Sequence, residues 1–202
     1  HLNSEVMTKT QTFWFFFLIA IVLIIPFFWG SYNSLVKREE VVESDWAQVE
    51  NQYQRRIDLI PNLVETVKGY ATHEQETFLE VTIARAKATQ LNIDAGNLTA
   101  ENLQQFNEVQ GELSQSLSRL MAVIENYPDL KANENFIMLQ GQLEGTENRI
   151  SVERKRFNES VNRYNTYRRR FPKNIAAAIL RFKEIKYFEA ERGAEASPEV
   201  GF

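Results

Sequence analysis

The stretch FWFFFLIAIVLIIPFFW, residues 13–29, decides how this chain is organised, because it contains no charged and no strongly polar side chain. A helix over these 17 residues rises about 25 Å, and a few flanking residues extend it to the ~30 Å interior of a bilayer. Trp14 and Trp29 mark its two ends, where indole rings favour the headgroup boundary, and Pro26 lies close enough to one end to cost little. The stretch predicts a transmembrane helix over residues 13–30, preceded by a short N-terminal segment, residues 1–12.

A cleaved signal peptide is the alternative interpretation of this stretch. The apolar run is longer than the roughly 7–15 residues typical of such a peptide, and no small-x-small cleavage pattern follows Trp29. We therefore expect an uncleaved membrane anchor. Lys9 precedes it, whereas Lys37 and Arg38 follow it, so the count of basic residues favours the following domain on the cytoplasmic side.

The composition of the 202 residues favours a helical protein with one domain beyond the anchor. Hydrophobic residues make up 44% of the chain, while the 8 glycines and 5 prolines occur singly, which disfavours a many-stranded fold. The formal net charge of -4 offers no basis for binding nucleic acid. The absence of cysteine removes disulfides, thiol nucleophiles and thiolate metal sites.

The first soluble helix is indicated by apolar residues at steps of three and four, which lie on one helical face: Val42, Trp46, Val49, Tyr53, Ile57 and Ile60. Pro61 lacks an amide hydrogen, so we expect the helix to kink or restart there, with Asp58 and Asn62 as candidate caps. The segment Asp58, Pro61 and Asn62 is therefore a candidate interaction motif. A simple connection between two helices explains it equally well.

The remaining helices follow from the same periodicity. A loop is expected over residues 92–97, then a helix carrying apolar residues from Leu103 to Ile124, then a long near-heptad helix from Phe136 to Phe171. One more short helix is expected within residues 175–188, before a flexible tail, residues 189–202. The predicted fold class is all-α, with an N-terminal transmembrane helix followed by an elongated antiparallel four-helix bundle over residues 31–188.

Residues suited to catalysis are scarce. The only histidines are His1 and His73, and the Glu-x-x-His spacing of di-iron bundles is absent. We expect no metal, no cofactor and no catalytic residue. Glu144 and Glu147, three residues apart, are expected to be solvated or paired with Arg149 and Arg154. A metal-dependent hydrolase using His73 and bundle carboxylates is the alternative function.

Polar residues beside the apolar rows form two further candidate sets. Buried amides must be hydrogen-bonded, so asparagines on or near the predicted core faces are candidates for fixing helix register: Asn33, Asn148, Asn158 and Asn165. The consecutive Arg168, Arg169 and Arg170 form a candidate membrane-facing basic patch, although such a run is commonly a solvated helix end.

Two long segments and one dipeptide follow one another along the chain: YNSLVKREEVVESDWAQVENQYQRRIDLIPNLVETVKGYATHE from Tyr32, NFIMLQGQLEGTENRISVERKRFNESVNRYN from Asn135, and the pair Phe171-Pro172. Through these segments the chain resembles the LemA family of bacterial membrane proteins. Phe157 departs from the family, whose members commonly have tyrosine there. The resemblance implies a single-pass protein of the bacterial inner membrane, with its N-terminus outside and its bundle in the cytoplasm, and implies no established enzymatic activity.

These observations together predict a non-enzymatic scaffold or adaptor that presents a helical bundle at the membrane. Its expected partners are the lipid bilayer and other proteins, copies of the same chain included, and no nucleic acid is expected.

Overall fold

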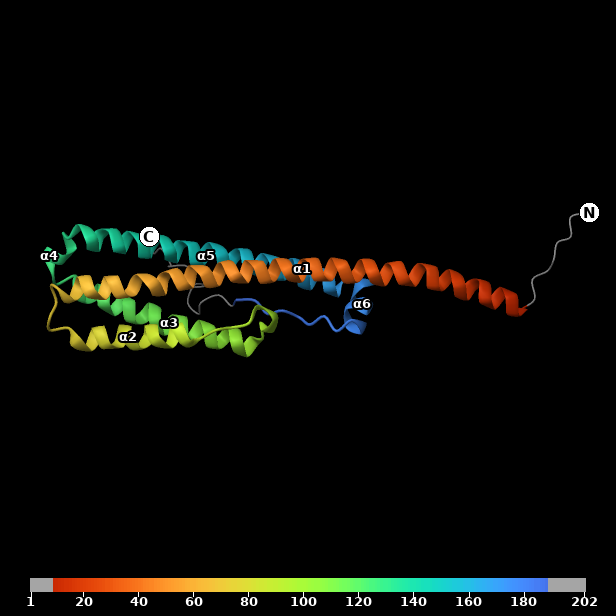
Figure 1. Ribbon diagram of the computed structural model, residues 1–202, viewed down its shortest axis with the longest axis horizontal. Coiled ribbons are helices and arrows are strands. Elements are labelled where there is room, and N and C mark those ends of the chain that lie inside the picture. The colour runs from red at the N-terminus through yellow and green to blue at the C-terminus, as the bar shows by residue number, and fades with distance from the viewer. Residues whose placement is uncertain (1–8, 189–202) are drawn as a thin grey trace, which may run out of the picture. The chain divides into compact units, whose positions relative to one another are not determined.

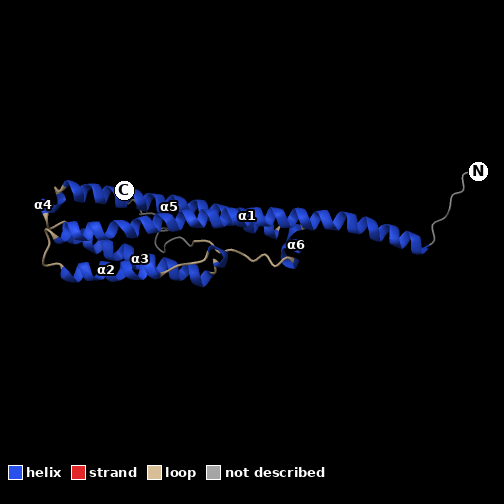
Figure 2. Cartoon of the chain, viewed as in Figure 1, coloured by secondary structure: helices blue, strands red, loops and turns tan. Residues whose placement is uncertain are grey.

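The computed structural model describes residues 9–188, and every regular element among them is a helix (Figures 1 and 2). The elements in chain order are α1 (Lys9–Lys68), α2 (Gln75–Gln90), the 3-10 turn η1 (Ala95–Asn97), α3 (Ala100–Ile124), α4 (Pro128–Lys131), α5 (Glu134–Arg169) and α6 (Lys173–Ile179). The predicted all-α class, with one long apolar N-terminal helix, is confirmed. The expected flexible tail, residues 189–202, lies outside the described residues.

The chain divides into two compact units. The anchor unit contains residues 9–41 and 163–184 of the described range, and the bundle unit contains residues 42–162 and 185–188. Helices α1 and α5 each contribute one part to each unit.

The bundle unit is built from α2, α3 and the adjoining parts of α1 and α5, which run in alternating directions (Figure 1). Its core consists of the apolar rows that the periodicity predicts, for example Ile57 and Ile60 from α1, Leu113 from α3 and Leu143 from α5. Aromatic rings cluster where residues 185–188, the C-terminal segment of this unit, pack against the helices. The cluster consists of Trp46, Phe106, Phe157 and Phe188, and its ring centroids lie 5.2–6.2 Å apart in the contacting pairs. The four-helix bundle is thus held by side chains spaced for burial on one face of each helix.

The connection between α2 and α3 forms where the loop was predicted. The Asp94 side chain accepts a hydrogen bond from the Gly96 amide, and the Thr99 hydroxyl accepts one from the Asn102 amide at the start of α3. Both are local side-chain caps that compete with helix continuation. They explain why the chain breaks there.

The expected restart at Pro61 is wrong, because α1 continues through Pro61 to Lys68 and the chain turns only between Gly69 and Glu74. The alternative, a kink within the helix at Pro61, stays a prediction. A proline in a helix leaves the carbonyl four residues earlier without its amide partner, which here is the carbonyl of Ile57. Arg85 of α2 donates its Nε–H to that oxygen at 3.2 Å. A neighbouring helix therefore supplies the donor that Pro61 removes, and no break is needed.

The short helix predicted within residues 175–188 begins and ends earlier, spanning Lys173–Ile179. The Phe182 amide donates to the Ala177 carbonyl at 3.0 Å, and the Arg181 amide donates to the Ala178 carbonyl at 3.3 Å. Arg181 has φ of 62°, so these bonds form the left-handed closure known as a Schellman motif. A glycine after the last turn is the usual sequence signal for such a helix end. Arginine occupies this left-handed position here, so the sequence does not reveal where α6 ends.

In the anchor unit, the apolar window of α1 has no buried side chains and is long enough to cross a membrane. Beyond it, Ser31 and Leu35 are buried, and α6 buries Ala176 and Ala177. Tyr164 of α5 is also buried, and its hydroxyl donates to the Lys183 carbonyl at 2.9 Å. Burial, reinforced by the nearby Glu39 carboxylate, raises the pKa of Tyr164 to about 12.

Candidate functional site

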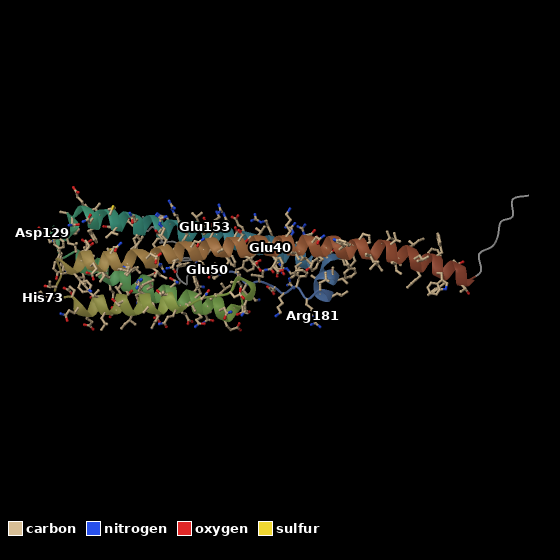
Figure 3. The ribbon with its side chains drawn as sticks, in the orientation of Figure 1. Glu40, Glu50, His73, Asp129, Glu153 and Arg181 are labelled. Carbon is tan, nitrogen blue, oxygen red and sulfur yellow. The ribbon has the colours of Figure 1, made fainter. Side chains whose placement is uncertain are left out.

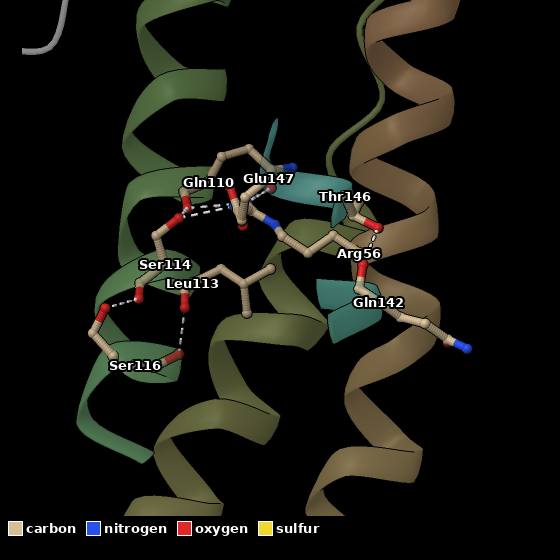
Figure 4. Close-up of polar contacts among 9 residues, drawn as sticks. Arg56, Gln110, Leu113, Ser114, Ser116, Gln142, Thr146 and Glu147 are labelled. Atoms are coloured by element: carbon tan, nitrogen blue, oxygen red, sulfur yellow. Dashed lines mark hydrogen bonds and ion pairs between the residues drawn. The ribbon is translucent and has the colours of Figure 1, made fainter. Parts of the chain in front are cut away.

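A buried arginine lies at the centre of the bundle unit. The Arg56 side chain of α1 is only 2% exposed, and its Nη1 donates to Glu147 Oε1 of α5 at 2.7 Å and to Ser114 Oγ of α3 at 2.9 Å. Its Nη2 donates to the side-chain oxygen of Gln110 at 2.6 Å and to the backbone oxygen of the same residue at 3.3 Å (Figure 4). One guanidinium therefore bonds to two further helices.

The positions of Arg56 and Gln110 in the sequence indicate this site, although the periodicity of the apolar residues alone does not. Arg56 follows Tyr53 by three residues and precedes Ile60 by four, so it occupies a core position of α1. Gln110 is likewise placed among the buried leucines of α3. A charged residue and an amide at core positions indicate a buried polar contact, because neither can be buried alone.

A cavity of ≈ 870 Å³ opens beside this network. Its polar lining includes Arg56, Glu147, Arg154 and Lys186, and the ring of Tyr53 forms part of its wall. The pKa of Tyr53 is raised, because the effect of burial exceeds the opposing effect of the nearby arginines Arg154 and Arg56. The Nε–H of Arg56 is buried without a hydrogen-bond partner. The lining supplies donors and charge for binding a polar group, and it contains no histidine to serve as a general base.

The residues considered for metal or acid–base chemistry are dispersed. His73 is exposed in the turn between α1 and α2, at the same end of the bundle as Asp129 (Figure 3). Within residues 9–188, no three His, Asp or Glu side chains gather to hold a metal ion. Glu144 accepts from the side-chain amide of Gln140, and Glu147 pairs with Arg56. The pairing of these glutamates with Arg149 and Arg154 stays a prediction.

The four candidate register asparagines occupy different environments. Asn33 and Asn148 are exposed, so they do not belong to the core. Asn165 is buried. Asn158 donates to the Phe188 carbonyl at 3.0 Å and accepts from the Phe188 amide at 2.8 Å. It therefore fixes the backbone of the C-terminal segment against α5, and a register role remains a prediction.

The two other candidate sets are found at the surface. Asp58 and Asn62 are exposed and cap no helix end: Asp58 accepts from Gln54 within the helix, and the Asn62 carbonyl accepts from the Thr66 hydroxyl. In the anchor unit Arg168 is half-buried near Glu184, at 4.0 Å, whereas Arg169 and Arg170 are exposed.

The chain is similar to several known proteins and matches one family model. The chain is 25% identical over 202 aligned residues to magnetosome protein MamQ 2 of Paramagnetospirillum magneticum, covering 91% of this chain and 73% of that protein. It is 24% identical to magnetosome protein MamQ of Magnetospirillum gryphiswaldense over the same shares. It is 23% identical to protein LemA of Metamycoplasma hominis, over 87% of this chain and 78% of that protein. None of these names carries an enzymatic activity. The LemA family model matches residues 45–202, so the chain belongs to the LemA family.

Proposed function

We propose that this protein is a non-enzymatic scaffold, anchored in the bacterial inner membrane by the start of α1, whose bundle binds other proteins. The observation that carries the proposal is the outer face of α2. Leu79 and Ile83 are 60% and 49% exposed, and they are spaced four residues apart, with exposed Ala86 three residues further. These side chains lie on one face of the helix.

The opposite face of α2 is already used. Phe78, Val81, Ala84 and Ala88 are buried in the bundle core. A helix at the surface of a soluble bundle ordinarily carries polar residues on its outer face, and the row of Leu79, Ile83 and Ala86 interrupts that pattern on α2. Single exposed apolar residues are common, but an aligned row at three- and four-residue steps supports a helix-to-helix contact.

A second copy of the chain is the first partner to test, because the same row on two chains can pair about a two-fold axis. The chain has no cysteine, so Ile83→Cys introduces a single thiol on this face. We expect a covalent dimer when isolated membranes are treated with a mild oxidant, since disulfide formation needs Cβ atoms to approach within about 4.5 Å.

The matched control is Val152→Cys on α5, which is 58% exposed and lies away from this row. It should remain monomeric under the same conditions. Equal dimer yields from the two cysteines would show random collision. A second experiment captures protein partners with the intact membrane protein, and with the double variant Leu79→Gln, Ile83→Gln as its comparison. If the two cysteines gave equal dimer yields and no reproducible partner depended on Leu79 and Ile83, the scaffold proposal would be refuted.

The orientation of the bundle is a separate part of the proposal. The basic residues Lys37 and Arg38 after the apolar run support a cytoplasmic bundle and an external N-terminus. Asn97 is exposed in the turn before α3, so Asn97→Cys should stay protected from an impermeant thiol reagent in intact cells. Labelling before the cells are lysed would place the bundle outside.

A further inference from the structure

The corner formed by the end of α5 and α6 has an exposed apolar face. Ile175 and Ile179 of α6 are 47% and 62% exposed, and their four-residue spacing places them in one row along the helix. Phe171, which is 81% exposed, precedes this row in the turn between α5 and α6. The opposite side of α6 is buried through Ala176 and Ala177. The row therefore faces away from the protein that α6 packs against.

The charge around this row is strongly positive. Residues 163–184 contain seven basic residues, namely Arg163, Arg168, Arg169, Arg170, Lys173, Arg181 and Lys183, against the single acidic Glu184. The chain as a whole has a net charge of -4, so the acidic residues lie elsewhere. Arg169 and Arg170 are exposed next to Phe171.

The position of the corner relative to the membrane anchor is fixed within the anchor unit. Lys173 Nζ donates to Ser31 Oγ at 3.2 Å and lies 4.7 Å from the centre of the Phe27 ring. Phe27 belongs to the final turn of the apolar run, and Ser31 is the first buried residue after it. Figure 1 shows α6 beside this part of α1. The apolar row of α6 is thus held where the anchor leaves the hydrocarbon.

We propose that the α6 corner is a second membrane contact, in which Phe171, Ile175 and Ile179 enter the bilayer interface and the neighbouring basic residues bind anionic lipid headgroups. Apolar side chains flanked by lysine and arginine are the composition that binds such an interface. The proposal rests on the membrane anchor and not on the protein-binding role of α2.

Site-specific fluorescence on the full chain tests the lipid contact. A single Ile179→Cys variant, labelled with an environment-sensitive fluorophore, is reconstituted alone into phosphatidylcholine vesicles with and without phosphatidylglycerol. We expect strong quenching by spin-labelled lipid and weak quenching by aqueous acrylamide in the anionic vesicles. Leu23→Cys within the apolar run is the lipid-exposed reference, and Val152→Cys, with 58% exposure, is the water-exposed one.

The double variant Arg169→Gln with Arg170→Gln tests the charge. Each basic residue near an anionic surface contributes about fivefold to binding. The double variant should therefore lower the ratio of lipid-bound to water-exposed label about 25-fold in anionic vesicles, and leave it unchanged in neutral ones. Far-UV circular dichroism checks that the variant keeps its helices. Phe171→Ser, which keeps every charge, should lower the ratio in both kinds of vesicle.

A label at residue 179 that is as accessible to acrylamide as the label at residue 152 in anionic vesicles would overturn the proposal. Shielding seen in native membranes but absent from vesicles containing only this protein would also overturn it, because the row would then be covered by another protein.

Discussion

The contact between Arg85 and the Ile57 carbonyl predicts a measurable coupling between Arg85 and Pro61. Pro61 removes the amide that would bond to this oxygen, and Arg85 Nε replaces it at 3.2 Å. Ile57 is 3% exposed, so its carbonyl has little access to water. Arg85→Met leaves the oxygen without a donor, which costs about 1–3 kcal/mol for a buried acceptor.

Pro61→Ala changes that cost. Residue 61 is already helical, so the alanine amide can bond to the Ile57 carbonyl in the ordinary i to i-4 pattern. In this background Arg85→Met removes only a second donor and should cost about 0.5 kcal/mol or less. The coupling free energy between the two positions is then about 1 kcal/mol or more, above the ~0.3–0.5 kcal/mol expected for independent sites.

The assay is urea unfolding of the full chain in detergent, followed by far-UV circular dichroism, for the wild type, both single variants and the double variant. Lys87→Met is the control on the same helix, because Lys87 forms a surface pair with Glu112 and has no contact with the proline turn. Its small effect should be the same with or without Pro61. An equal loss of stability from Arg85→Met in both backgrounds would refute the role assigned to Arg85.

Three further predictions follow from the buried polar contacts. Glu147→Leu should destabilise the bundle by about 3 kcal/mol or more, and Arg56→Met by less, because the first leaves a buried charge unpaired; Glu147 is 45% exposed, so it can be hydrated when Arg56 is lost. Urea unfolding of the two variants would contradict this if the order were reversed. Asn158→Ala removes both bonds to the Phe188 backbone and should raise amide exchange there about 30-fold, for a loss of about 2 kcal/mol. The pKa of Tyr164 is raised from 10.0 to about 12, so the phenol stays protonated to a higher pH in the folded protein than in the unfolded one. The resulting stability is complete below about pH 10 and is lost as pH rises towards 12, so Tyr164→Phe should flatten that alkaline fall in a circular dichroism titration.

The parts of the fold that the sequence predicts well are those set by helical periodicity. The rows from Val42 to Ile60 and from Leu103 to Ile124 are buried as expected. A row of this kind depends only on local spacing and on the need to bury apolar area. The end of α1 was misplaced because the local effect of Pro61 was considered without Arg85, which lies 24 residues later in the chain. Local rules cannot include a donor that only tertiary packing supplies.

The candidate polar residues were predicted by a local criterion too, namely that an asparagine on or near a predicted core face is a buried amide. Asn33 and Asn148 are nevertheless exposed. Arg56 is buried although arginine is rarely buried, and residue type alone does not single it out. The better criterion is position: a polar residue that interrupts a core row must be paired inside the protein, whatever its type.

Position also explains why this one arginine can set the alignment of α3. Leu103, Gln110, Leu117 and Ile124 are seven residues apart and all buried, so they occupy equivalent places along the core face. A slip of α3 by one heptad would keep apolar contacts in register but would bring Leu103 or Leu117 to the place of Gln110. The Arg56 guanidinium would then lose the side-chain oxygen of Gln110, which accepts from it at 2.6 Å. Leucine at that place has no side-chain acceptor, so a buried donor would be left unsatisfied at a cost of about 1–3 kcal/mol. Apolar rows are sufficient to bring the helices together, and the single amide within the row is what distinguishes the native alignment from its near-equivalents.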